Sequence, residues 1–159
     1  MNDLTPIDNY LHGSWEALGN AAPSLVALAQ LSSENWMRGL RGNVDELSLE
    51  AQAILFAARE RGTIELRAVN SAFDAASRLL AVYVEMSDEH IVAFRDAHRP
   101  EVTIRFLDGF RQLCALGFIV HHIFRDFSLS TYGFEVARTI EKASVAEQLA
   151  HATEFGLHD

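Results

Sequence analysis

The sequence predicts a mainly α-helical fold with a short strand, a β-hairpin and additional helices at both ends. Apolar residues recur every three or four positions over residues 47–58 and 100–116, which is the period of an amphipathic helix. Residues 63–69 and 118–129 instead alternate apolar and polar side chains, which is the period of a strand with one exposed face. Glycine, proline and capping residues stand near the boundaries of these stretches.

The composition is typical of one globular domain. The chain has 159 residues, of which 49% are hydrophobic and 22% charged. We expect a loosely helical extension over residues 1–45 and a domain with a C-terminal helix over residues 46–159, the two forming one compact unit. No basic and apolar leader opens the sequence, and no run approaches the ~20 apolar residues that a membrane span needs. A cytoplasmic protein without a membrane partner is therefore expected.

The N-terminal extension carries weak helical signals. Thr5, Pro6 and Asp8 suit a helix start, as N-cap, first-turn proline and early acidic residue. Two further short helices are predicted over residues 24–31 and 33–40.

A clearer helix begins at Ser48. Arg59 and Arg61 suit its last turn, where cations favour the carbonyl end of the helix dipole, and Gly62 suits a left-handed stop. The alternating stretch over residues 63–69 then predicts a short strand.

A long helix is predicted after Asn70, the expected N-cap. Its apolar stripe would consist of Phe73, Ala76, Leu80 and Tyr83. Ser87 would open a further short helix, with Ile91 and Phe94 facing the core.

The strongest amphipathic helix is predicted over residues 100–116. Pro100 suits its first turn and Gly117 its end. The core-facing residues are expected to be Phe106, Phe110 and Leu113. The solvent-facing residues are expected to be Glu101, Arg105, Asp108 and Gln112.

The period then changes from 3.6 to 2, which predicts a hairpin over residues 118–129. Arg125 and Asp126 would form its turn, although tight hairpins prefer Asn-Gly or Gly-rich pairs. A helix is expected from about Thr131. Ser144 and Glu147 predict a capping box for a last helix that ends near Gly156.

Two sequence stretches, LCALGFI at 113–119 and FSLSTYGFEVA at 127–137, carry a resemblance to a known family. Gly117 lets the chain leave the helix, and Leu129 anchors the returning strand. Ser130 or Thr131 caps the closing helix, while Gly133 permits close packing and Ala137 faces the core. Together with the order of the elements, these residues resemble the winged-helix (winged helix-turn-helix-like) domain over about residues 48–141. The resemblance implies a winged-helix-like core between the flanking terminal helices.

In that resemblance, residues 100–116 take the place of the recognition helix and Arg125 lies at the tip of the wing. The candidate nucleic-acid contacts are then Arg99, Arg105, Arg111 and Arg125. The same helix also carries Glu101 and Asp108, whereas phosphate contacts require cations. Mixed charge on this face favours a protein partner over DNA.

The overall charge also favours a protein partner over DNA. The formal net charge is −9, which disfavours nucleic acid and anionic lipid on average. We therefore predict a small regulatory or adaptor protein that acts through protein–protein interaction or self-association, such as a homodimer. The alternative is a winged-helix DNA-binding transcriptional regulator.

No catalytic, cofactor or metal site is predicted. The sequence contains no phosphate-binding loop, dinucleotide fingerprint or nucleophile elbow. The single cysteine, Cys114, is expected on the core side of a helix and unreactive. His90 and His98 would lie ~12 Å apart on one helix, and the adjacent His121 and His122 would point to opposite faces of a strand. We therefore expect neither an enzyme nor a cofactor-dependent protein.

Overall fold

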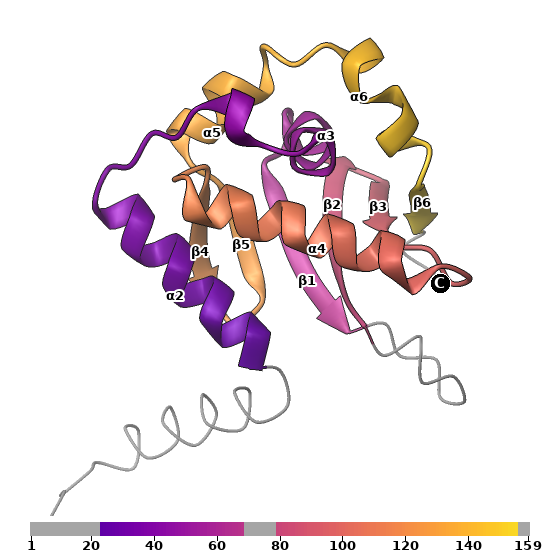
Figure 1. Ribbon diagram of the computed structural model, residues 1–159, viewed down its shortest axis with the longest axis horizontal. Coiled ribbons are helices and arrows are strands. Elements are labelled where there is room, and N and C mark those ends of the chain that lie inside the picture. The colour runs from indigo at the N-terminus through magenta and orange to yellow at the C-terminus, as the bar shows by residue number, and fades with distance from the viewer. Residues whose placement is uncertain (1–22, 69–78, 156–159) are drawn as a thin grey trace, which may run out of the picture.

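The computed structural model describes residues 23–68 and 79–155, which form a six-stranded antiparallel sheet with helices (Figure 1). The helices are α2 (Pro23–Met37), the 3₁₀ helix η1 (Val44–Glu46), α3 (Leu49–Ala58), α4 (Pro100–Ala115), α5 (Thr131–Ala137) and α6 (Lys142–Leu149). The strands are β1 (Thr63–Ala68), β2 (Leu80–Ser87), β3 (His90–Phe94), β4 (Ile119–Ile123), β5 (Asp126–Leu129) and β6 (Ala152–Phe155). The prediction of a mainly α fold is wrong, because this is a mixed α/β fold.

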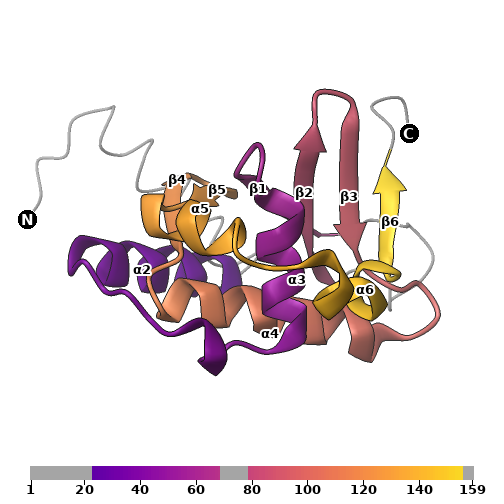
Figure 2. The same cartoon turned by 90° about the horizontal axis from the view of Figure 1, so that it is seen from above.

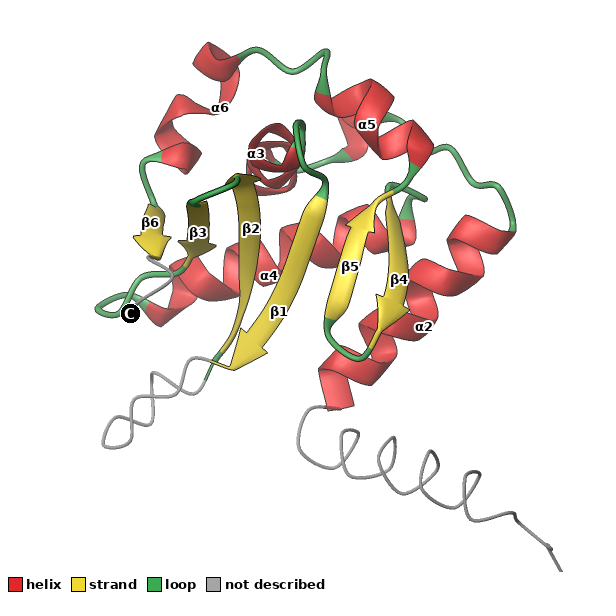
Figure 3. Ribbon diagram, turned by 180° about the vertical axis from the view of Figure 1, so that it is seen from behind, coloured by secondary structure: helices red, strands yellow, loops and turns green. Residues whose placement is uncertain are grey.

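The strand order is β4-β5-β1-β2-β3-β6. Helices α3 and α4 pack on one face of this sheet, and Figure 2 shows α3 running across α4. From behind, the strands lie in front of α4 and α2, while α3, α5 and α6 lie along one end of the strands (Figure 3). The main core lies between that face and the helices.

The predicted helix and strand after Ser48 are confirmed. Ser48 is the N-cap of α3, since its Oγ accepts a hydrogen bond from the Ala51 N–H at 3.2 Å. Gly62 ends the segment with φ +75°, the left-handed region that favours glycine. Strand β1 then buries Ile64 and Leu66. The alternation seen in the sequence is therefore a true strand pattern.

The two helices predicted after Asn70 are wrong where the structure describes them. Leu80 and Tyr83 lie on β2, and Ser87 ends that strand instead of opening a helix. Residues 80–87 and 90–94 form a hairpin in which Val84 pairs with Val92. Asn70, Phe73 and Ala76 lie outside the described residues. A second buried cluster, formed by Ala81, Tyr83 and Ala93, lies on this hairpin.

The predicted hairpin over residues 118–129 is confirmed as β4 and β5, with Ile119 opposite Leu129. Its turn lies one residue earlier than expected, at Phe124 and Arg125, because Ile123 pairs with Asp126. Phe124 has φ +49°, which a bulky side chain rarely adopts. Strand β5 also pairs with β1, which joins the hairpin to the rest of the sheet.

The individual roles assigned to residues 117–137 are confirmed. Gly117 has φ +86°, and the Oγ of Ser130 accepts the Gly133 N–H at 3.0 Å as the N-cap of α5. Leu129 and Ala137 are buried. A Cβ at Gly133 would collide with the carbonyl oxygen of Phe118. These residues dock α5 closely against the start of β4.

The terminal elements differ from the prediction. A single helix, α2, replaces the two short helices expected over residues 24–31 and 33–40. Helix α6 has Glu141 as its N-cap, so the predicted capping box of Ser144 and Glu147 is wrong. The chain then forms β6 beside β3 where a continued helix was expected.

We expect Gly133→Ala to lower the free energy of unfolding by about 2 kcal/mol, because the added Cβ overpacks against backbone that cannot rotate away. This loss outweighs the gain of up to ~1 kcal/mol in helix propensity. Chemical denaturation measures it, with Glu135→Ala on the exposed side of α5 as the control. An unchanged or raised stability would contradict the close packing.

We expect Phe124→Asn to raise the free energy of unfolding by about 0.5–1 kcal/mol, since asparagine tolerates a left-handed backbone better than phenylalanine does. Phe124→Val, which is β-branched, should lower stability at the same position. Equal effects of the two substitutions in thermal unfolding would show that the backbone conformation of Phe124 has no cost.

Candidate functional site

Helix α4 has the most sharply divided surface among the described helices. Its buried side holds Phe106, Phe110 and Leu113, as the sequence predicts. The Phe106 ring stacks on Phe94 with ring centroids 4.7 Å apart, and the Phe110 ring meets Phe127 edge-on at 5.0 Å. These contacts fix the rotation of α4 against the sheet and thereby determine which side chains it exposes.

The exposed side of α4 carries alternating charges. In chain order they are Glu101, Arg105, Asp108 and Arg111. Arg105 lies 3.5 Å from the Glu101 carboxylate, and the Arg111 Nε donates to Asp108 at 2.8 Å. All four side chains are at least half exposed.

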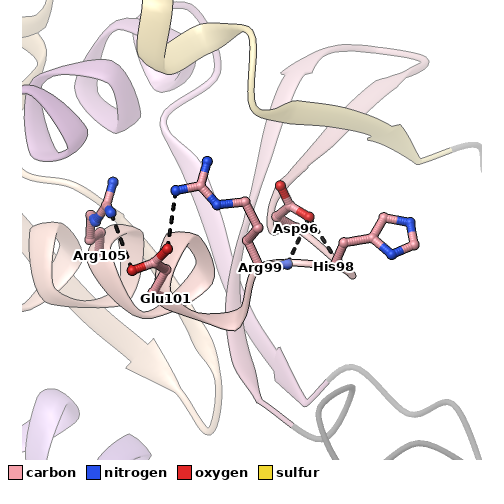
Figure 4. Close-up of polar contacts among 5 residues, drawn as sticks. All are labelled: Asp96, His98, Arg99, Glu101 and Arg105. Atoms are coloured by element: carbon pink, nitrogen blue, oxygen red, sulfur yellow. Dashed lines mark hydrogen bonds and ion pairs between the residues drawn. The ribbon is translucent and has the colours of Figure 1, made fainter.

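Glu101 also binds a second guanidinium. Arg99 donates from Nη2 to Glu101 Oε1 at 3.0 Å, so the carboxylate lies between Arg99 and Arg105 (Figure 4). The hydrogen bond from Arg99 and the two neighbouring positive charges lower the pKa of Glu101. The hydrogen bond from Arg111 likewise lowers the pKa of Asp108. Each of these three guanidinium groups thus has a carboxylate neighbour within the chain, and Arg99 and Arg105 share Glu101.

A turn held by Asp96 positions this face. The Asp96 Oδ1 accepts the N–H groups of His98 at 2.8 Å and Arg99 at 3.1 Å, just before α4 begins (Figure 4). The Asp96 N–H donates to the buried Thr103 Oγ at 3.0 Å. The hydrogen bond from His98 is the main cause of the lowered pKa of Asp96. The ionised carboxylate therefore fixes the entry into α4.

An apolar groove runs between α2 and α4 beside these charges. It encloses a cavity of about 340 Å³. Its lining residues are Ser24, Ala27, Leu28, Leu31, Ile104, Leu107, Asp108 and Arg111. Ile104 is 52% exposed although it belongs to a well-packed helix. Exposed apolar surface with a charged rim is typical of a protein-binding site.

The sequence interpretation did not single out Ile104. The sequence does contain an indication of an exposed apolar site: Ile104 stands between Glu101 and Asp108, on the side of the helix expected to face solvent. The groove itself could not be predicted, because its other wall is α2, whose placement depends on tertiary packing. The side chain of Asn35 on α2 donates to the Cys114 carbonyl oxygen at 3.4 Å and helps to join the two helices.

The fourth predicted nucleic-acid contact, Arg125, lies apart from the other three at the β4–β5 turn. Its Nε is 3.0 Å from Glu65 Oε1, and the same carboxylate accepts a hydrogen bond from Arg67 at 2.9 Å. Arg99, Arg105 and Arg111 lie on or next to α4. All four candidates therefore have a carboxylate neighbour.

A second exposed apolar position lies at the same turn. Ile123 is 58% exposed and Phe124 is 42% exposed. The two side chains form a small exposed apolar tip at the end of the hairpin. This tip is a useful comparison surface for the α2–α4 groove.

A polar cavity of about 300 Å³ lies near the start of α4. Its lining residues are Glu50, Arg99, Val102, Arg105, Phe106, Glu147, Gln148 and His151. Carboxylates and guanidinium groups are mixed in it, so it favours neither a purely anionic nor a purely cationic ligand.

The remaining candidate groups are Cys114, His121 and His122. Cys114 is fully buried, and burial raises the pKa of its thiol, as expected for a structural cysteine. His121 and His122 bind the Phe124 carbonyl oxygen and the Ser128 hydroxyl, each at 2.7 Å. Within residues 23–68 and 79–155 there is no cluster of three histidine, cysteine or acidic residues placed to hold a metal ion.

Comparisons with protein-family models, with curated proteins and with solved structures find no match to this chain. In the part of the chain that the structure describes, every helix is too short or too polar to span a membrane.

We expect the contribution of Asp96 to stability to depend on pH. Its pKa is lowered in the folded state, so its contribution is present above the unfolded-state pKa of about 3.9 and is lost as the pH falls through the lower folded value. Asp96→Ala should therefore lower the thermal midpoint relative to wild type at pH 5–7, with the difference shrinking below about pH 4.

The matched control is Glu34→Ala, which removes an exposed acid on α2. A wild-type advantage over Asp96→Ala that stays constant down to pH 3 would show that the carboxylate charge is not what holds the turn.

Proposed function

We propose that this protein is an interaction module that binds another protein through the face formed by α2 and α4. The supporting observation is the exposed Ile104 in an apolar groove whose rim carries charges of both signs. Burying the exposed half of an isoleucine side chain contributes about 1 kcal/mol. A partner with an apolar anchor flanked by both acidic and basic groups would fit this surface.

A DNA-binding role is the alternative that the winged-helix resemblance implies. It draws support from the position of the β4–β5 hairpin beside β1 and from α4 directly before it. The carboxylates weigh against it, because a DNA phosphate that approached these arginines would also approach Glu101, Asp108 and Glu65, which repel it. The alternating charges of α4 serve a protein partner better than a uniformly negative one.

The test compares wild-type protein with Ile104→Asp and Ile123→Asp as immobilised baits in a lysate of the source cells. Protein retained by wild type and Ile123→Asp, but lost with Ile104→Asp, is the expected result. Circular dichroism confirms that both variants fold; both replaced side chains are more than half exposed, so no cavity is created.

A parallel titration measures binding of wild type and the Arg105→Glu/Arg111→Glu variant to duplex DNA over a salt series. We expect no salt-dependent binding. Affinity that falls steeply with salt and is lost in the double variant would contradict the proposal and support the DNA-binding alternative.

A further inference from the structure

We propose that the partner of the α2–α4 face is a second copy of this chain, with the two α4 helices packed antiparallel about a two-fold axis near position 106. This inference rests on the proposed function and specifies its partner. Three features of α4 support it: the order of its charges, the exposed apolar residues beside them and the exposure of the existing ion pairs.

The charges on α4 are complementary to their own reversed order. From Glu101 to Arg111 they run negative, positive, negative, positive, so the reversed helix presents positive, negative, positive, negative. A two-fold axis placed midway between Glu101 and Arg111 also lies within half a residue of the midpoint of Arg105 and Asp108, a difference of ~0.8 Å along the helix. One axis therefore brings Glu101 opposite Arg111 of the second copy and Arg105 opposite Asp108 of the second copy. Parallel helices in register would instead oppose like charges.

The apolar residues lie in the same stretch. Ile104 and Leu107 lie on the side of α4 that borders the α2 groove. Along the helix axis they are within two residues of position 106, where the two-fold axis would pass. In the antiparallel arrangement, Ile104 of each copy lies beside the groove of the other. The contact is isologous, so it closes as a dimer.

The ion pairs within one chain do not prevent this exchange. Arg105 and Glu101 are 53% and 62% exposed, and Arg111 and Asp108 are 53% and 50% exposed. Exposed pairs contribute little to stability, so they can exchange partners across an interface at little cost. The gain comes from desolvating Ile104 and Leu107, while the charges set the orientation.

The test uses two charge-swapped variants of the full chain. Glu101→Arg/Asp108→Arg leaves only positive charges at the four charged positions of α4, and Arg105→Glu/Arg111→Glu leaves only negative ones; Arg99, which precedes α4, is unchanged in both. In analytical ultracentrifugation we expect wild type to dimerise. Each variant alone should have a dimer dissociation constant raised at least about tenfold, since like charges then face each other. An equimolar mixture of the two variants should recover the dimer as a heterodimer.

Restored association in the mixture also shows that both variants fold, because a misfolded variant could not regain a specific partner. Swapping the charge of Glu135 on α5, as Glu135→Arg, is the control and should leave the dimer unchanged. A monomeric wild type, or variants that still dimerise alone, would overturn the inference. If wild type is monomeric yet Ile104→Asp still loses a partner captured from lysate, the proposed function stands and only the second copy is excluded.

Discussion

The crossing of α3 over α4 at Gly109 is the contact on which the rest of the structure depends. A Cβ at this position would lie 2.8 Å from the backbone nitrogen of Ala51, so only glycine allows the two helices to approach this closely. The approach places Phe106 and Phe110 in the core against the sheet. With those rings fixed, the rotation of α4 is fixed, and so are the residues on its opposite side.

The functional proposal follows from this constraint. Because α4 cannot rotate without withdrawing its phenylalanines from the core, Ile104 remains exposed beside the α2 groove. The charges that flank it are balanced within the chain, which favours a partner of mixed charge and disfavours polyanions. The order of those charges then selects an antiparallel copy of the same helix.

The sequence predicted the elements whose signals are local. Ser48, Gly62, Gly117 and Ser130 ended or capped elements as expected, because caps and left-handed turns depend on one residue and its neighbours. It failed over residues 80–94, where the spacing of Leu80 and Tyr83 imitated a helix. The run LAVYV is rich in β-branched and aromatic residues and is buried in the sheet, a pattern that periodicity alone cannot distinguish from a buried helix. The charged side of the candidate site was predicted, whereas the groove depends on how α2 packs, which no local pattern specifies.

Cross-linking that tests the orientation of the two α4 helices is the most direct measurement of the central claim. Glu101→Cys and Arg111→Cys variants, prepared separately and mixed, are treated with a short bismaleimide; the native Cys114 is buried and does not compete. We expect covalent dimers mainly in the mixture, because position 101 of one copy faces position 111 of the other. Equal cross-linking of each variant with itself, or none in the mixture, would contradict the antiparallel pairing.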